Sequence, residues 1–275
     1  MAIAFDSRLP LNDGSKIPLL GLGVWQAAPG KETRKAVAYA LECGYRLIDT
    51  AQMYGNERDV GIAVRESGLP REDVFVTTKL WNSDHGYDAA LRAFEASRRD
   101  LGLDYVDLYL IHWPVPRLRH ESWKALLKLK QDGLARSIGV SNYTIPHLQE
   151  LLPATSIPPS VNQVEFHPFL YQRELLEFCK AHRIQLEAYS PLTRGRRLKH
   201  PVIVEIAANY QRTPAQVLIR WSLQHGLVVI PKSARPERIR ENAAVFDFEL
   251  KSADMARLDS LDEHSRVAWN PEDLP

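Results

Sequence analysis

The sequence has few cysteines and no long apolar segment. Its 275 residues include only two cysteines, Cys43 and Cys179, and both fall within helical patterns. So few cysteines argue against a disulfide framework and are typical of a reducing compartment. No stretch approaches the roughly 20 apolar residues that cross a bilayer, and residues 1–10 lack the basic start and apolar core of a signal peptide. We therefore expect a cytoplasmic protein with no membrane partner.

The sequence also lacks an excess of charge of either sign. It has 35 basic residues against 34 acidic ones, which gives a formal net charge of +1. A chain without a net field does not attract nucleic acid, so we expect a small-molecule partner. No linker, low-complexity tract or short repeat interrupts the 275 residues, a length that suits one α/β barrel. Residues 1–275 are predicted to form one domain, and the protein is expected to be a monomer.

Motifs that identify metal and dinucleotide sites are missing as well. The sequence contains neither His-x-His nor His-Glu-x-x-His. A metal-dependent hydrolase on a barrel needs several ligands, and His112 and His167 alone make a poor set, so no metal is expected. Gly21 and Gly23 follow a predicted strand, but Gln26 occupies the place of the third glycine of a dinucleotide fingerprint. A tight turn near a barrel mouth explains these two glycines at least as well.

What the chain does contain is a regular alternation of short apolar runs and amphipathic helical patterns. Eight runs rich in Val, Ile, Leu and Tyr are predicted as strands. They cover residues 19–22, 46–49, 74–79, 106–112, 137–142, 161–165, 184–190 and 227–232. Residues 11–15 (LNDGS) predict the turn of a β-hairpin that plugs one barrel end, and the last gap predicts two helices, 201–210 and 214–225. The expected fold is α/β, a (β/α)8 TIM barrel with an N-terminal β-hairpin and extra helices.

Polar residues end these predicted strands one after another. Asp49, Lys79 and His112 close three successive strands, and Tyr54 follows Asp49 closely enough to share its rim. The pKa of a tyrosine is ordinarily about 10, and a nearby ammonium such as that of Lys79 lowers it. Asp49 in turn keeps Lys79 protonated, and His112 donates a hydrogen bond to a substrate oxygen. Together the four side chains are predicted to protonate an oxyanion.

Each of these four residues also has an ordinary structural explanation when it is taken alone. Asp49 suits a turn at a strand end, Lys79 suits the surface, and Tyr54 suits a core. His112 is explained equally by a satisfied polar position. Their occurrence together at successive positions of one rim favours a catalytic site over four unrelated structural roles.

Three long segments of the chain occur in the order of known family signatures. They are residues 44–61 (GYRLIDTAQMYGNERDVG), 136–143 (RSIGVSNY) and 230–245 (IPKSARPERIRENAAV). Through them the chain resembles the aldo-keto reductases over essentially its whole length, including their bacterial 2,5-diketo-D-gluconate reductase-like members. The resemblance implies a catalytic tetrad of Asp49, Tyr54, Lys79 and His112, with Tyr54 as the proton donor. Relatives that reduce carbon–carbon double bonds are expected to carry Glu in place of His112, so carbonyl reduction is implied.

The same resemblance implies NADPH as the cofactor. Its nicotinamide amide would be held by Ser141, Asn142 and Gln163, and its ring would stack on Tyr189. The other implied cofactor contacts are Ser190 and Leu192 for the pyrophosphate, Lys232, Ser233 and Arg238 for the ribose 2'-phosphate, and Glu241 and Asn242 for the adenine. A guanidinium, an ammonium and a hydroxyl suit a phosphate well, which favours NADPH over NADH. Without the tetrad, a solvated helix start would explain this last cluster better.

The substrate is the least determined part of the prediction. Trp25, Trp81, Trp113 and Trp269 fall in loops that such reductases use as pocket walls, so we expect a small carbonyl substrate, with packing as the alternative. The basic run at 194–199 (RGRRLK) suits an anionic substrate, the cofactor phosphates or plain solvation. Its loop is short, which predicts an open pocket and broad carbonyl specificity. A cofactor-binding regulatory or structural subunit with little turnover is the alternative function.

Overall fold

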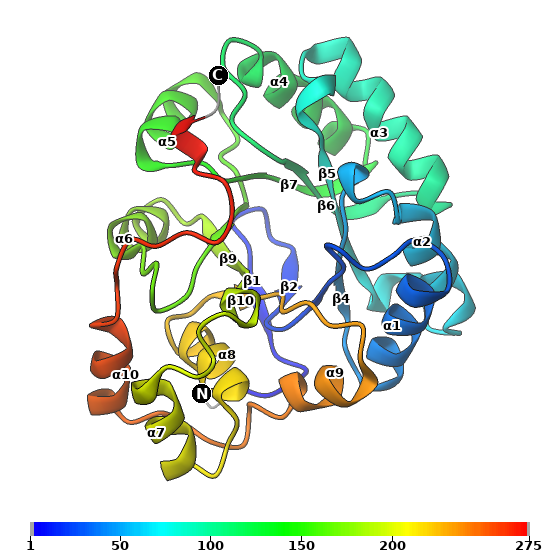
Figure 1. Cartoon of the computed structure of the whole chain (residues 1–275). Coiled ribbons are helices and arrows are strands. Elements are labelled where there is room, and N and C mark those ends of the chain that lie inside the picture. Colours follow the sequence, from blue (N-terminus) through cyan, green and yellow to red (C-terminus); the bar gives the residue numbers. More distant parts are fainter. Residues whose placement is uncertain (1–2, 274–275) are drawn as a thin grey trace.

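The computed structural model describes residues 3–273, and eight parallel strands form its centre (Figure 1). The strands are β3 (Leu22–Gly23), β4 (Leu47–Asp49), β5 (Phe75–Leu80), β6 (Val106–Ile111), β7 (Ala135–Ser141), β8 (Val161–Glu165), β9 (Gln185–Tyr189) and β10 (Val228–Val229). They neighbour one another in sequence order from β3 to β10. Parallel bridges from Leu20 to Val229 and from Gly23 to Lys232 join the first strand to the last. The predicted (β/α)8 barrel is confirmed.

Helices surround this ring of strands (Figure 1). They are α1 (Lys31–Glu42), α2 (Glu57–Glu66), α3 (Tyr87–Leu101), α4 (Arg119–Gln131), α5 (Ile145–Leu151), α6 (Arg173–Ala181), α7 (Pro201–Asn209), α8 (Pro214–Gln224), α9 (Pro236–Ala243) and α10 (Ser252–Asp259). The two helices expected between the last two strands are α7 and α8. Thr213 caps α8, because its hydroxyl accepts from the Gln216 amide at 3.3 Å while the Gln216 side chain accepts from the Thr213 amide at 2.9 Å.

The N-terminal hairpin closes the barrel at the end where the strands begin. It pairs β1 (Arg8–Pro10) with β2 (Lys16–Pro18) in antiparallel register, as the turn sequence predicted. Leu11 and Ile17 of the hairpin join a buried cluster with inward-facing residues of five strands and the segment that follows β10. In Figure 1 the hairpin accordingly lies within the ring of strands. Only the opposite end of the barrel, where the strands finish, is left to form a site.

Strand periodicity decides which side chains reach that end. Alternate residues of a strand face the same side. When an apolar residue near the start of a strand points into the barrel, the polar residue two or four positions later therefore also points inward. Leu47 and Phe75 belong to the interior cluster, which directs Asp49 and Lys79 toward the barrel axis. The same count from Val161 directs Gln163 and Glu165 inward. The polar interior is therefore a consequence of the strand pattern.

Gly21 and Gly23 serve the closure of the barrel and not the tight turn predicted as one explanation. Neither residue has a positive φ. A Cβ on Gly21 would lie 2.4 Å from the Leu47 side chain, and one on Gly23 would lie 3.0 Å from the Ile230 carbonyl oxygen. The two glycines leave room for the close approach of the neighbouring strands on either side.

Helix packing around the barrel depends on one further glycine, and it gives a first prediction. A Cβ on Gly61 of α2 would lie 1.8 Å from the carbonyl oxygen of Leu101, at the end of α3. Backbone cannot yield as a flexible side chain does, so Gly61→Ala should lower the free energy of unfolding by about 3 kcal/mol or more. Denaturant unfolding measures this loss. Gly68→Asn is the control, because Gly68 has φ +71° with no atom within 4 Å, and an equal loss in both variants would contradict the explanation.

The composition predicted neither a membrane-spanning segment nor a disulfide framework, and the structure bears on both within the residues it describes. Within residues 3–273, no helix combines the length and the apolar character that a bilayer crossing requires. Cys43 and Cys179 are both free thiols. Burial raises the pKa of the Cys179 thiol to about 12, so this side chain packs as a small apolar group. The prediction that residues 1–275 form one domain stays a prediction.

Candidate active site

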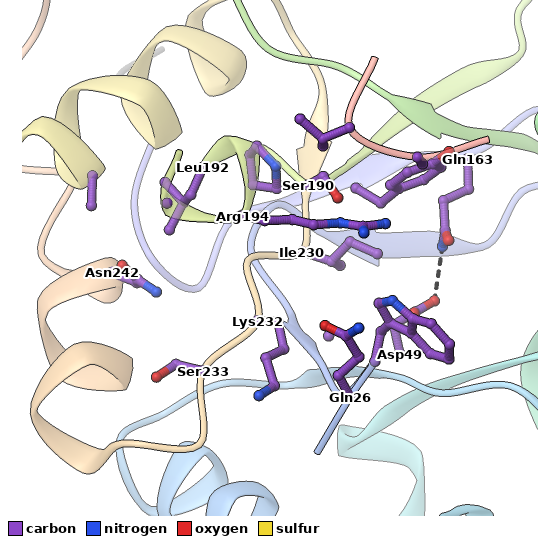
Figure 2. A pocket seen from close by; sticks show the side chains of 18 of the residues that line it. Gln26, Asp49, Gln163, Ser190, Leu192, Arg194, Ile230, Lys232, Ser233 and Asn242 are labelled. Carbon is purple, nitrogen blue, oxygen red and sulfur yellow. Dashed lines mark hydrogen bonds between the residues drawn. The ribbon is translucent and has the colours of Figure 1, made fainter. Parts of the chain in front are cut away.

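A cleft of about 990 Å³ opens at the carboxyl ends of the strands. It extends from Asp49 and Gln163 on one side of the view in Figure 2 to Ser233 and Asn242 on the other. Loops that follow six of the eight strands contribute to its walls, and β8 contributes through Gln163. The C-terminal segment also contributes, through residues 267–269. This is the barrel face on which the sequence predicts a site, and its length suits an extended ligand.

A buried ion pair lies beneath the cleft. The Lys79 ammonium donates to both carboxylate oxygens of Asp49 at 2.7 and 2.8 Å and to the carbonyl oxygen of Thr50 at 2.8 Å. The Tyr54 hydroxyl lies 3.4 Å from the same nitrogen. Lys79 is fully buried, so Asp49 must compensate its charge. Asp49 raises the pKa of Lys79 despite the opposing effect of burial, and Lys79 therefore carries its charge at neutral pH.

The pKa of Tyr54 differs from the prediction. The neighbouring ammonium was expected to lower it below its ordinary value, but burial raises it to about 12, and Lys79 only reduces the extent of the rise. The Trp25 ring lies over Tyr54 with centroids 4.8 Å apart and helps to exclude water. A hydroxyl with this pKa is fully protonated near neutrality. Tyr54 is thus available as an acid, while its phenolate is stabilised mainly by Lys79.

His112 completes the group. Its ring lies edge-on to that of Tyr54 with centroids 5.8 Å apart, and both residues line the cleft. Burial, together with the charge of Lys79, holds the pKa of His112 well below its usual range, so the imidazole is neutral. A neutral imidazole on a cleft wall can donate or accept a hydrogen bond, and its low pKa keeps it from taking the proton of the Tyr54 hydroxyl. The four side chains predicted to converge are brought together.

Four residues of the predicted nicotinamide site also lie around this end of the cleft. Asn142 has φ 62°, a left-handed conformation that Asn tolerates well. Its amide nitrogen donates to the carbonyl oxygen of His112 at 3.0 Å, and its amide oxygen accepts from the Tyr189 hydroxyl at 2.7 Å. The Ser141 hydroxyl donates to the carbonyl oxygen of Gln163 at 2.8 Å. The Asn142 amide nitrogen also donates to the Ser141 hydroxyl at 3.1 Å, so the four residues line the cleft as one hydrogen-bonded group that Gln163 joins through its backbone carbonyl.

Every residue predicted for the rest of the cofactor also lines the cleft, from Ser190 near its middle to Ser233 and Asn242 at its far end (Figure 2). They are Ser190, Leu192, Lys232, Ser233, Arg238, Glu241 and Asn242. Lys232 and Arg238 are exposed and form no salt bridge with any residue in the described range 3–273. The Glu241 carboxylate accepts from the Thr213 hydroxyl at 2.6 Å. Two unpaired cations beside a buried Ser233 make this end suitable for a phosphate.

The basic run at 194–199 divides between two environments. Arg194 and Lys199 line the cleft, and Figure 2 shows the Arg194 side chain extending across it near Ile230. Arg197 instead pairs with Glu263, and its guanidinium lies 4.6 Å from the centroid of the Phe169 ring. The run is therefore neither wholly solvated nor wholly available to a ligand.

Three of the four predicted substrate-pocket tryptophans line the cleft. Trp25, Trp113 and Trp269 do so, and Trp269 is 60% exposed. Trp81 is not among the lining residues of the cleft, and its ring packs on His112 and Trp269 with centroids 5.3 and 6.4 Å apart. The result is an aromatic wall beside Tyr54 and His112, with Trp81 behind it.

Two buried carboxylates near the cleft were missed by sequence reasoning. Glu165 accepts the backbone amides of Val267 at 2.6 Å and Ala268 at 3.0 Å, and it pairs with His167 at 2.9 Å. It thereby attaches the C-terminal segment, with its pocket residues, to β8. Glu187 lies on β9 beneath Gln163. Both could have been found by continuing the inward count along their strands. His167, named as a poor metal ligand, pairs with Glu165 instead, and residues 3–273 hold no group of three or more potential metal ligands.

The chain is similar to known proteins over nearly its whole length. The sequence profile of the Aldo/keto reductase family matches residues 19–263. The 9,11-endoperoxide prostaglandin H2 reductase of Trypanosoma cruzi is 52% identical over 96% of this chain and 94% of its own length. The glyoxal reductase of Bacillus subtilis is 49% identical over 100% of this chain and 99% of its own. A solved structure of a Gox0644 mutant in complex with NADPH is similar with a TM-score of 0.92 and 45% identity, over 98% of each chain.

Proposed function

The chain belongs to the aldo/keto reductase family, and from that premise we propose that it reduces the carbonyl groups of small aldehydes and ketones with NADPH. The observation that carries this proposal is the 3.4 Å contact between Lys79 and the Tyr54 hydroxyl at the base of the cleft. A protonated phenol beside a buried ammonium, with a neutral imidazole next to it, is the chemistry that an alkoxide requires. This arrangement supports carbonyl reduction over a hydrolytic reaction.

The proposed mechanism assigns one task to each side chain. The substrate oxygen accepts hydrogen bonds from Tyr54 and His112, which position the carbonyl carbon. Bound NADPH supplies the hydride that this carbon receives. As negative charge develops on the oxygen, Tyr54 donates its proton, and Lys79 stabilises the phenolate that is left. Asp49 keeps Lys79 protonated throughout, because an unpaired ammonium would be costly at this depth.

The residues at the far end of the cleft suit NADPH. Its ribose 2'-phosphate needs cationic and hydroxyl donors, and Lys232, Ser233 and Arg238 supply both kinds. Glu241, held by Thr213 at 2.6 Å, and Asn242 offer an acceptor and an amide for the adenine. Complexes of similar proteins are consistent with this cofactor, since the Gox0644 mutant is in complex with NADPH.

Cofactor preference gives a second prediction. Arg238→Ala should raise the KM for NADPH about tenfold while the KM for NADH changes little, because only NADPH carries the phosphate that the guanidinium would bind. Steady-state kinetics with both cofactors measure this selectivity. Arg240→Ala is the matched control, because Arg240 is exposed on the same helix but lies outside the cleft. Equal effects on NADPH and NADH would contradict the assignment.

For the substrate we propose small carbonyls, dicarbonyls or keto sugars. The aromatic wall of Trp25, Trp113 and Trp269 binds apolar groups, while Arg194 and Lys199 favour polar or anionic ones. The glyoxal reductase of Bacillus subtilis is 49% identical to the chain, which makes glyoxal the first substrate to test. The experiment is NADPH oxidation, followed by absorbance, with glyoxal, methylglyoxal, aromatic aldehydes and keto sugars.

The outcome of that assay separates the two functions that the sequence leaves open. Turnover of at least one carbonyl that favours NADPH over NADH supports the reductase. Tight NADPH binding with no turnover of any carbonyl would instead support the cofactor-binding regulatory or structural subunit. The intact group of Tyr54, Lys79, Asp49 and His112 favours the enzyme, since a binding protein has no need of a phenol beside a buried ammonium.

A further inference from the structure

The proposed mechanism does not use Glu187, although this carboxyl lies close beneath the site. Glu187 is fully buried on β9, and its register partner on β8 is Gln163. Both residues have the inward parity of their strands, so their side chains meet inside the barrel. The Gln163 amide nitrogen donates to Glu187 Oε2 at 3.0 Å. Glu187 Oε1 is buried and has no hydrogen-bond partner within the described part of the chain.

Gln163 is held from two sides. Its amide nitrogen also donates to Asp49 Oδ2 at 2.8 Å, an interaction drawn in Figure 2. An amide nitrogen has only two hydrogens, and both are now used by carboxyl groups. The oxygen and nitrogen of an amide point in different directions. With the nitrogen held by Asp49 and Glu187, the Gln163 oxygen therefore points away from both carboxyl groups. Gln163 lines the cleft, so this acceptor is available to a ligand.

We propose that Glu187 is a positioning residue that orients the Gln163 amide so that its oxygen accepts a hydrogen bond from the carboxamide NH₂ group of the nicotinamide. This inference rests on the proposed cofactor. Asp49 alone cannot impose the orientation as firmly, because a single hydrogen bond leaves the second N–H free to turn toward the cleft. A reversed amide would place the Gln163 oxygen against the Asp49 carboxylate and would remove the N–H that Glu187 Oε2 now accepts, so it is unfavourable.

The protonation of Glu187 agrees with this role. Burial, with the nearby Asp49 carboxylate as the next cause, raises the pKa of Glu187 to about 8. Near neutrality Glu187 is therefore mostly uncharged, and two carboxyl groups share one amide without strong repulsion. Its Oε2 accepts from Gln163, which leaves Oε1 to carry the proton. A glutamine at position 187 would present a similar oxygen to Gln163.

The test compares binding of NADP⁺ with binding of its 3-acetylpyridine analogue, in which a methyl group replaces the carboxamide NH₂. Calorimetric titration gives the dissociation constant of each. The wild-type protein should prefer NADP⁺ about tenfold, the contribution of roughly one hydrogen bond. Glu187→Met should lose that preference, and Glu187→Gln should keep it. A purely structural role for Glu187 would weaken both ligands equally and leave their ratio unchanged.

Glu187→Thr serves as a second variant should Glu187→Met be unstable. Threonine suits a strand but is too short to reach Gln163, so the same loss of preference is expected. The inference would be overturned if Glu187→Met or Glu187→Thr still preferred NADP⁺ about tenfold over the analogue. It would also be overturned if the wild-type protein bound the two ligands equally well. Failure of the wild type to bind either ligand would contradict the proposed function itself. The two failures are therefore distinguishable.

Discussion

Tyr54→Phe is expected to reduce kcat for carbonyl reduction about a thousandfold and to leave NADPH binding near the wild-type level. The substitution removes the hydroxyl that contacts Lys79 in the cleft, at 3.4 Å, and keeps the ring that packs against Trp25. The alkoxide would then contact only the neutral imidazole of His112, which is a much weaker acid than a phenol. Steady-state kinetics give kcat, and fluorescence titration with NADPH gives the dissociation constant.

Tyr210→Phe is the matched control for this loss. Its hydroxyl donates to Asp254 at 2.8 Å, and Tyr210 lies outside the cleft. We expect a small loss of stability and an unchanged kcat. Should Tyr54→Phe retain most of the wild-type kcat, Tyr54 is not the proton donor, and His112 would become the side chain to examine.

Lys79→Met is expected to cause the second large effect, on both stability and activity. The substitution leaves the Asp49 carboxylate buried without its partner, which should cost about 3–5 kcal/mol in the free energy of unfolding. It also removes the charge that stabilises the Tyr54 phenolate, so kcat should fall at least a hundredfold. Denaturant unfolding and steady-state kinetics measure the two losses separately.

The double variant Lys79→Met/Asp49→Asn distinguishes these two causes. Asparagine removes the unpaired charge and still offers an oxygen to Gln163, which donates to Asp49 at 2.8 Å in the structure. The double variant should regain much of the lost stability but none of the activity. Recovery of activity together with stability would show that Lys79 acts only through folding.

The sequence predicted the parts of the molecule that depend on local pattern. Short apolar runs that alternate with helical patterns determine the barrel, and the polar residues that end those runs determine which side chains share a face. Asp49, Lys79 and His112 were found in this way, because neighbouring parallel strands finish at one rim. Thr213 was found because the N-terminus of a helix needs acceptors for its unpaired amides.

Features that depend on depth and on distant contacts were not predictable. The sequence indicates that Lys79 and Tyr54 are close, but it does not say how much water reaches them, and burial decides the pKa of Tyr54. The contact of Glu187 with Gln163 requires the register of β8 and β9. The attachment of Val267 to Glu165 joins residues 102 positions apart. No local pattern encodes such pairings.

Deuterium transfer tests the proposed reduction most directly. The protein is mixed with glyoxal and NADPH that carries deuterium at both C4 positions, and the alcohol product is analysed by mass spectrometry. Direct hydride transfer in the cleft predicts one carbon-bound deuterium for each carbonyl group reduced, with a near-complete loss of product in Tyr54→Phe. Tight NADPH binding without deuterated product, from glyoxal or any other carbonyl offered, would contradict the reductase and favour a cofactor-binding subunit.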